Sequence, residues 1–277
     1  MITFFQSTIL GIIQGLTEFL PISSTAHLRI VPAILKWDDP GTAFSAVLQL
    51  GTMLAVLIYF WKDLLKIYGA LLSDLFSYKK PVSNESKLAF WILLGTIPIC
   101  IFGLLFKEPL EAGMVRNLNL ISFYLIFFGL LLFVSEMIAK QNRKLSQINA
   151  LDVLMIGIAQ AFALIPGASR SGVTLFAGLL LGFKRTDAAR FSFLLSVPAV
   201  LLSGLLELNT LFSGALQECT PPWDKLFMGV IGAYLAGYFT IDFLLKFLQT
   251  HKTYVFVVYR ILLGVLVIYL NHIGVVK

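Results

Sequence analysis

Two short polar stretches interrupt an otherwise apolar sequence, and both contain side chains that could do chemistry. The first reads Gln14-Gly-Leu-Thr-Glu18-Phe-Leu-Pro21-Ile-Ser-Ser24-Thr-Ala-His27. Gln14 and Glu18 lie four residues apart and share one face of a helix, and Pro21 ends that helix. Ser24 and His27 share a face of the next helix. Singly, each residue has a structural interpretation, such as a serine that caps a helix or a hydrogen-bonded interior histidine. A carboxylate, hydroxyls and an imidazole so close together at membrane depth instead favour a functional site.

The second stretch has the composition of an anion-binding site. It reads Pro166-Gly-Ala-Ser169-Arg170-Ser171-Gly-Val-Thr174 and opens a predicted helix. The first N–H groups and the positive dipole end of that helix are available to a ligand. The planar guanidinium of Arg170 can donate two parallel hydrogen bonds to a phosphate, and neighbouring hydroxyls can add more. The alternative is an ion pair between Arg170 and Glu18, which would also bring the two stretches together.

The composition places these stretches in a membrane. Of 277 residues, 58% are hydrophobic and 13% are charged, against about 25% charged residues in a soluble domain. A disordered chain and an ordinary cytosolic enzyme are therefore excluded, and membrane lipids are the expected surroundings. The net charge of +6 does not indicate a nucleic-acid partner, because no basic stretch is interleaved with aromatic residues.

Charge-free runs predict about six transmembrane helices. A spanning helix needs about 20 apolar residues. Six runs meet this requirement, some of them with one flanking polar residue: 40–61, 88–106, 117–135, 191–206, 226–241 and 261–276. Residues 1–35 and 151–183 are each interrupted by proline and small polar residues, and we expect re-entrant helical hairpins there, because broken backbone at membrane depth must be buried or line a cavity. The fold class is an all-α polytopic membrane protein with a single domain, 1–277.

The two hairpin regions resemble each other. Matching fragments occur in the same order in both: Gly11-Ile-Ile-Gln14 with Gly157-Ile-Ala-Gln160, and Pro21-x-x-Ser24 with Pro166-x-x-Ser169. We therefore expect an inverted-topology repeat with halves of about 1–140 and 141–277. In such folds, sites lie near the midplane where broken helices meet.

The basic residues predict the orientation. Thirteen of the 21 Lys and Arg residues fall in loops on one side of the predicted spans and five on the other. The side with thirteen should be cytoplasmic. Both termini and the entrance of the first hairpin then face outward.

Charged and polar residues elsewhere in the spans receive structural interpretations. We expect Asp242 and Arg260 to pair as a structural bridge, and Glu136 and Glu207 to be solvated near span ends. Three polar residues could line a cavity or simply pack between helices: Gln49, Thr52 and Tyr259.

Taken together, the two long motifs, the stretch Phe44-Ser-Ala-Val-Leu-Gln49 and the pair Tyr259-Arg260 resemble the undecaprenyl-diphosphatase family, which is also known for bacitracin resistance. The resemblance covers essentially the whole chain. It implies a hydrolase that removes the terminal phosphate of an isoprenoid diphosphate lipid and returns the carrier lipid to cell-wall synthesis. It also implies the bacterial cytoplasmic (inner) membrane, and the orientation predicted from the basic residues places the active site on the outer side. The sequence leaves the oligomeric state open, with a homodimer as one alternative.

The resemblance also implies roles for the motif residues. The catalytic set is Glu18, Ser24, His27 and Arg170, with Ser24 as candidate nucleophile and His27 as general acid/base within its reach. The set implied to bind phosphate is Thr25, Ser169, Arg170, Ser171 and Thr174. Glu18 and Gln14 are expected to hold a divalent cation, Mg²⁺ or Ca²⁺.

Two alternatives stay open at this point. Direct attack by water, activated by Glu18 or His27, competes with the serine mechanism. A flippase or transporter of an anionic isoprenoid lipid is the alternative function, because inverted repeats with broken helices are also a transporter architecture. The position of Gln14 is one where many family members have glutamate and either residue is admitted, which suggests that Gln14 orients water, metal or phosphate and carries no proton.

Overall fold

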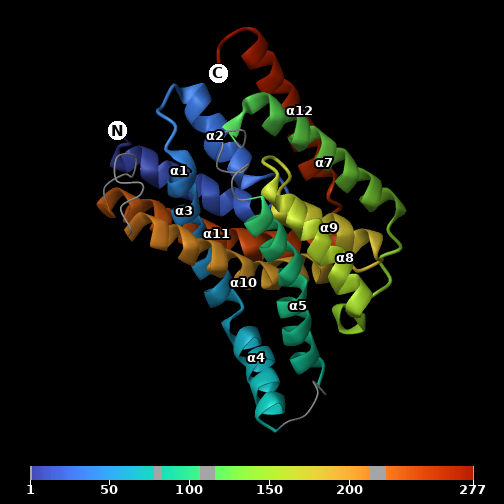
Figure 1. The fold of residues 1–277 in the computed structure, drawn as a ribbon. Helices are drawn as coiled ribbons and strands as arrows, with labels where there is room; N and C mark the ends of the chain where they lie inside the picture. Colours follow the sequence, from blue (N-terminus) through green and yellow to red (C-terminus); the bar gives the residue numbers. More distant parts are fainter. Residues whose placement is uncertain (1, 78–82, 107–115, 213–222, 277) are drawn as a thin grey trace.

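The computed structural model describes residues 2–77, 83–106, 116–212 and 223–276, with 205–212 as backbone alone. The secondary structure of this part of the chain is helical, and its only β feature is one isolated bridge between Arg143 and Phe183. Figure 1 shows the helices gathered in one bundle, with one helical hairpin extending from its lower end.

Six of the described helices are long and apolar enough to cross a membrane. They are α3 Gly41–Tyr59, α5 Asn84–Leu105, α7 Leu118–Ile138, α10 Arg185–Phe212, α11 Trp223–Thr250 and α12 Tyr254–His272. Each coincides with one of the six predicted spans, and each exposes large hydrophobic side chains that would face lipid. The prediction of an all-α polytopic membrane protein is confirmed.

Two spans begin several residues earlier than the sequence predicts. α10 begins at Arg185, whose guanidinium pairs with the buried carboxylate of Glu136. α12 begins at Tyr254 and contains Arg260, which is fully buried and bonds backbone carbonyls. A search for charge-free runs stops at Arg190 and at Arg260, whereas the fold pairs Arg190 with Asp63 and satisfies Arg260 with carbonyls.

Two helix pairs are too short to cross a bilayer and form the predicted hairpins. The first consists of α1 Phe4–Phe19 and α2 Ser24–Leu35. The second consists of α8 Ala150–Ala161, the short 3₁₀ helix η3 Phe162–Leu164, and α9 Arg170–Leu180. At 1.5 Å per residue, the 11 residues of α9 span about 17 Å, well short of the roughly 30 Å hydrocarbon core.

The two breaks have the same local geometry. Ser23 precedes α2 with φ 73° and ψ 98°, and Ser169 precedes α9 with φ 71° and ψ 113°. Each serine side chain accepts a hydrogen bond from the amide three residues on. A positive φ is costly for a residue with a Cβ, so both breaks hold a strained serine. The structurally equivalent pair is thus Ser23 and Ser169; the sequence match of Ser24 to Ser169 is wrong by one residue.

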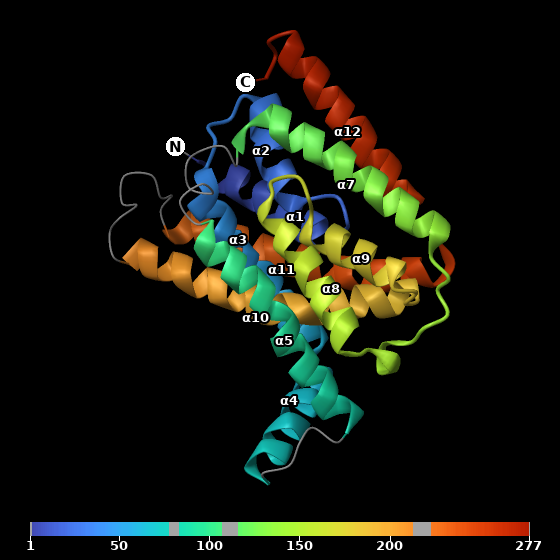
Figure 2. The ribbon, with the colours of Figure 1, turned by 45° about the vertical axis from the view of Figure 1, so that its right-hand side comes forward.

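Each hairpin packs on a spanning helix of the other half of the chain. α1 lies along α11, and α8 lies along α5 (Figures 1 and 2). Both contacts need glycine, because a Cβ on Gly11 would lie 2.1 Å from the carbonyl oxygen of Gly229, and one on Gly157 would lie 2.6 Å from that of Gly95. An inverted repeat would produce this arrangement, in which each hairpin packs on a helix of the other half. The boundaries of the repeat, about 1–140 and 141–277, stay a prediction.

One helix falls where the sequence analysis placed a loop. α4 Trp61–Phe76 follows α3 directly and forms the extended hairpin of Figure 1 with α5. It buries Leu64, Ile67 and Leu71, whose spacing of three and four residues is a helical signal. Because the segment contains Lys62 and Lys66, a search for apolar spans passes over it.

Two structural predictions about charged residues are wrong. Asp242 does not pair with Arg260; it accepts hydrogen bonds from Lys246 at 2.8 Å and from Tyr59 at 3.1 Å. Glu136 is not solvated; its side chain is fully buried and bonds Arg185. In both cases a nearer partner, one helical turn away or on a neighbouring helix, satisfies the charge. The side chain of Glu207 lies outside the described residues.

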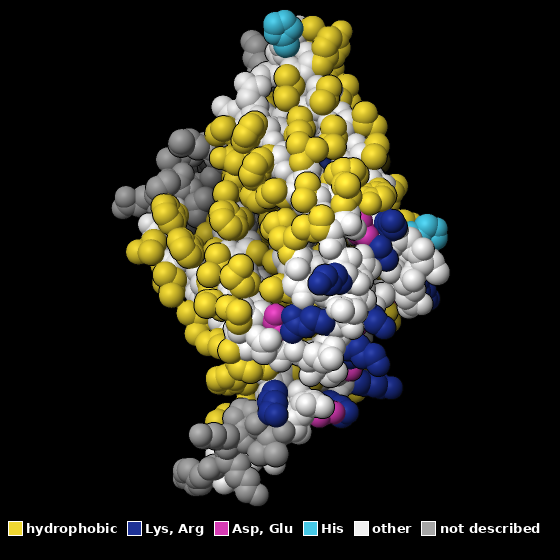
Figure 3. Space-filling model, turned by 90° about the vertical axis from the view of Figure 1, so that its right-hand side faces the viewer, with side chains coloured by type: hydrophobic (Ala, Val, Ile, Leu, Met, Phe, Trp, Pro, Cys, Tyr) yellow, Lys and Arg dark blue, Asp and Glu magenta, His cyan; other side chains and the backbone are white. Residues whose placement is uncertain are grey.

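The described basic residues are unevenly distributed. Figure 3 shows Lys and Arg side chains gathered on the lower part of one face and hydrophobic side chains covering the upper part. This separation is compatible with the predicted orientation. Four of the basic residues counted for it lie outside the described residues: Lys79, Lys80, Lys107 and Lys277.

Candidate active site

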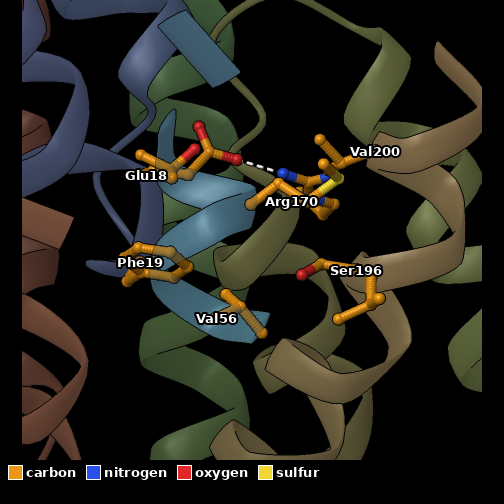
Figure 4. A pocket seen from close by; sticks show the side chains of 9 residues that line it. Glu18, Phe19, Val56, Arg170, Ser196 and Val200 are labelled. Carbon is orange, nitrogen blue, oxygen red and sulfur yellow. Dashed lines mark hydrogen bonds and ion pairs between the residues drawn. The ribbon is translucent and has the colours of Figure 1, made fainter. Parts of the chain in front are cut away.

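An ion pair joins the two broken hairpins at the centre of the bundle. Glu18 lies one residue before the end of α1, and Arg170 is the first residue of α9. Arg170 Nη2 donates to Glu18 Oε1, as the dashed line in Figure 4 shows. The side chains are only 6% and 17% exposed for Glu18 and Arg170. The predicted meeting of the two motifs is therefore present, in the form of the ion pair that the sequence offered as the alternative to a phosphate site.

The second carboxylate oxygen of Glu18 gathers two more motif residues. Glu18 Oε2 accepts from Gln14 Nε2 at 2.8 Å and from Ser24 Oγ at 2.5 Å. The hydroxyl of Ser24 therefore points at a carboxylate that can take its proton. Gln14 Oε1, the other polar atom of that amide, is buried and has no hydrogen-bond partner.

A narrow cleft adjoins this ion pair between α3 and α10. Beside Glu18 and Arg170, its lining includes the hydroxyl residues Thr52 and Ser196. Figure 4 shows Phe19, Val56 and Val200 forming the surrounding apolar walls. The cleft thus has a charged, hydrogen-bonding end and apolar sides, which suits an anionic head group on an apolar tail.

His27 does not contact Ser24 as predicted. Its Nδ1 lies 2.7 Å from the carbonyl oxygen of Ser23, and its Nε2 lies 2.7 Å from the hydroxyl of Tyr259 on α12. Because a carbonyl only accepts, Nδ1 carries the hydrogen and Nε2 of the neutral ring accepts from Tyr259. The group that touches the Ser24 hydroxyl is Glu18, so the base beside the candidate nucleophile is the carboxylate and not the imidazole.

The hydroxyls of the second motif differ in their availability. Ser171 Oγ donates its only hydrogen to the carbonyl of Leu20 at 3.0 Å. The hydroxyls of Ser171 and Ser169 lie 3.1 Å apart, and Ser169 must therefore be the donor in that hydrogen bond. That hydrogen could turn to a ligand. Thr174 is buried and shares a 2.6 Å hydrogen bond with Ser192, and it does not line the cleft. Its prediction as a phosphate-binding residue is not supported by its position.

Some of the remaining polar residues line the cleft and others do not. Thr25 is exposed and lies 3.1 Å from Ser23 through their hydroxyls. Thr52 lines the cleft, as one of its two interpretations proposed, whereas Gln49 does not. Sequence reasoning did not single out Ser196, although Ser192 and Ser196 lie four residues apart in an apolar helix and therefore share a face.

The described residues contain no group of three or more His, Cys, Asp or Glu side chains that could hold a metal by themselves. A cation would therefore depend on few protein oxygens. In the first hairpin, Glu18 offers two carboxylate oxygens, both of which accept hydrogen bonds here, and Gln14 offers an Oε1 without a partner.

The chain matches known proteins over most of its length. A family model described as bacitracin resistance protein BacA matches residues 7–266. An undecaprenyl-diphosphatase of Chlorobaculum parvum is 48% identical over 268 residues, which cover 94% of each chain. Relatives of the same name from Gloeobacter violaceus and Myxococcus xanthus are each 49% identical, and cover 95% and 97% of this chain and 90% and 89% of theirs.

Proposed function

The chain belongs to the bacitracin resistance protein BacA family, and from this membership together with the site we infer that it hydrolyses undecaprenyl diphosphate to undecaprenyl phosphate and inorganic phosphate. It is an enzyme, an undecaprenyl-diphosphate phosphatase, and a multi-pass membrane protein. The reaction returns the carrier lipid to cell-wall synthesis and underlies bacitracin resistance. The observation that carries our assignment of the site is the contact of Glu18 with both Arg170 and Ser24.

We propose that Arg170 exchanges its carboxylate partner for the terminal phosphate of the substrate. Its guanidinium can present two parallel N–H groups to that phosphate. The first amides of α9 have no acceptor within the helix, and the positive dipole end of α9 points to the same place. Ser169 adds its hydroxyl by releasing Ser171, and Thr25 contributes from the first hairpin. Thr174 supports this end of α9 through Ser192 instead of binding phosphate.

We propose Glu18 and Gln14 as the protein ligands of a divalent cation, Mg²⁺ or Ca²⁺. The fit rests on the Gln14 amide, whose Nε2 donates to the Glu18 carboxylate and whose Oε1 is buried without a hydrogen-bond partner. Hard cations take oxygen ligands and commonly share them with substrate phosphates. When bound, the cation would neutralise part of the diphosphate charge. The family resemblance supplies the expectation that such a cation is needed.

For the chemical step, we propose Ser24 Oγ as nucleophile and Glu18 as its base. Once Arg170 has turned to the phosphate, Glu18 accepts the hydroxyl proton as Oγ attacks the terminal phosphorus, and undecaprenyl phosphate leaves. Water then hydrolyses the phosphoserine. His27, held by Tyr259, is proposed to move protons for this second step. Phosphoserine trapped by acid quenching of a single turnover supports this path; direct attack by water leaves none.

We propose further that the enzyme lies in the bacterial cytoplasmic membrane with its site opening to the outer side. The support is the separation of basic residues predicted from the sequence and visible on the described surface (Figure 3). A homodimer stays a prediction.

The test of the site is phosphate release from undecaprenyl diphosphate by purified protein, with and without EDTA. We expect EDTA to stop release and added Mg²⁺ or Ca²⁺ to restore it. We expect Glu18→Gln to abolish release while the protein still folds. The matched control is Asp242→Asn, which neutralises another intramembrane carboxylate, one that pairs with Lys246 away from the cleft. Lipid movement without phosphate release in every variant would support the transporter alternative and contradict the proposed site.

A further inference from the structure

Arg260 is a fully buried cation in the middle of the bundle. It lies on α12, which packs along α7 (Figures 1 and 2). Within the described part of the chain, no carboxylate pairs with it. A cation without a counter-charge is expensive at this depth, so its other contacts must compensate.

Those contacts are four backbone carbonyls, and three of them belong to the two hairpin breaks. Nη1 donates to Pro21 of the first break at 3.1 Å. Nη2 donates to Gly167 at 2.9 Å and Ala168 at 3.0 Å in the second break. Nε donates to Leu125 of α7 at 3.1 Å. One rigid guanidinium plane therefore joins the backbone of both breaks to a spanning helix.

The three break carbonyls that Arg260 binds need such a donor. Backbone at a helix break has no intrahelical partner, and the hydrocarbon region supplies no water in its place. Pro21 lies between Glu18 and Ser24, and Ala168 lies two residues before Arg170. A contact that fixes these carbonyls relative to each other therefore also fixes Glu18 and Ser24 of the first break relative to Arg170 of the second.

A glycine on α9 provides an independent sign that the position of this guanidinium matters. A Cβ on Gly172 would lie 2.8 Å from Arg260 Nη1, closer than real atoms approach. The neighbour of Arg260 on α12, Tyr259, holds His27 from the same turn. Adjacent residues of α12 thus contact the backbone of both breaks and a motif side chain.

We propose that Arg260 is a positioning residue of the phosphatase: it sets the separation between the Glu18–Ser24 pair and Arg170 that the transition state requires. This inference rests on the Glu18–Arg170 site proposed above. Lysine cannot replace arginine in this role, because an ammonium lacks the planar fork that reaches acceptors on three segments.

The first test is Arg260→Lys, with phosphate release and thermal unfolding measured on the same preparations. We expect kcat per folded enzyme to fall about 100-fold with KM within about threefold, because a misplacement of the order of 1 Å can cost that much and the lost contact acts on the transition state. The control is Arg143→Lys, since Arg143 also donates to backbone carbonyls, those of Leu181 and Gln147, outside the site, and in addition pairs with Asp152. The control should lose stability only.

The second test is Gly172→Ala, whose Cβ would displace the guanidinium without removing it and would also lie 3.2 Å from Ser169 Oγ. The double variant with Arg260→Lys separates the two contacts. We expect a similar loss of kcat and a strongly non-additive double variant, because in Arg260→Lys the clashing nitrogen is gone. This variant keeps the proposal testable even where Arg260→Lys folds poorly.

Unchanged kcat per folded enzyme in both variants would overturn the proposal and leave Arg260 a purely structural residue. Additive losses in the double variant would also contradict it. The Glu18–Arg170 site itself is tested by other variants: full phosphate release by Glu18→Gln or by Arg170→Ala would contradict the site, whatever the result for Arg260.

Discussion

Arg170→Lys is the substitution that most directly tests the phosphate clamp, by which we mean the proposed binding of the terminal phosphate by the Arg170 guanidinium. Lysine keeps the charge and can still pair with Glu18, whose other oxygen retains its hydrogen bonds from Gln14 and Ser24. The folded protein should therefore survive. What is lost is the two-point donor fork, and removal of one such transition-state contact costs about 10²–10³ in rate, or roughly 3–4 kcal/mol. We expect Arg170→Lys to lose most of its turnover and Arg170→Ala still more.

Stability separates the clamp from a merely structural ion pair. Removing one partner of a buried pair costs about 3–5 kcal/mol, and this pair is slightly exposed, so Arg170→Ala should lose no more than the lower value. If the pair were structural, Arg170→Ala would misfold and adding Glu18→Gln would restore stability by removing the stranded charge. The assay is phosphate release from undecaprenyl diphosphate together with thermal unfolding of the three variants. Full activity in Arg170→Ala would refute the clamp.

Three further predictions follow from other parts of the molecule. Gln14→Glu should retain phosphate release, because the family admits either residue there; a folded but inactive variant would show that the role of Gln14 is misread. Glu136→Gln should lower the free energy of unfolding by about 3 kcal/mol, measured by thermal or denaturant unfolding, because it leaves Arg185 without its buried partner, while kcat per folded enzyme stays unchanged. In intact cells, a cysteine at Asn271 should react with an impermeant thiol reagent and one at Lys144 should not; the reverse labelling would overturn the orientation.

The sequence predicted which residues form the site better than it predicted which groups they contact. Glu18, Ser24 and Arg170 are recognisable because charged and hydroxyl groups are costly in apolar helices. The contact of His27 with Tyr259 and those of Arg260 with backbone carbonyls join segments more than ninety residues apart and depend on helix packing. A charge in a span suggests a carboxylate partner, so Asp242 was the natural but wrong choice for Arg260.

The same limit explains the two hydroxyl assignments that differ most from expectation. Thr174 lies one helical turn after Arg170, and sequence proximity places it near the phosphate. Its hydroxyl instead bonds the carbonyl of Arg170 at 2.8 Å and the side chain of Ser192, because that face of α9 packs on α10. Ser196 reaches the cleft from α10, and no motif marks it in the sequence.

The geometry of the two breaks explains why a single site needs both of them. With Ser23 aligned on Ser169, Ser24 falls opposite Arg170. The first residue of each short helix is therefore the candidate nucleophile in one break and the proposed phosphate-binding residue in the other. Glu18 falls opposite Leu164 and Gln14 opposite Gln160. Gln14 donates to Glu18, whereas both amide atoms of the buried Gln160 have no hydrogen-bond partner, as expected where leucine stands in place of the acid. The same strained turn therefore presents a proton acceptor and a nucleophile from one side and a cation from the other. Neither break alone holds all the groups proposed for phosphoryl transfer. In our proposal, the hydrogen bonds of Arg260 to both breaks fix the distance between the Glu18–Ser24 pair and Arg170.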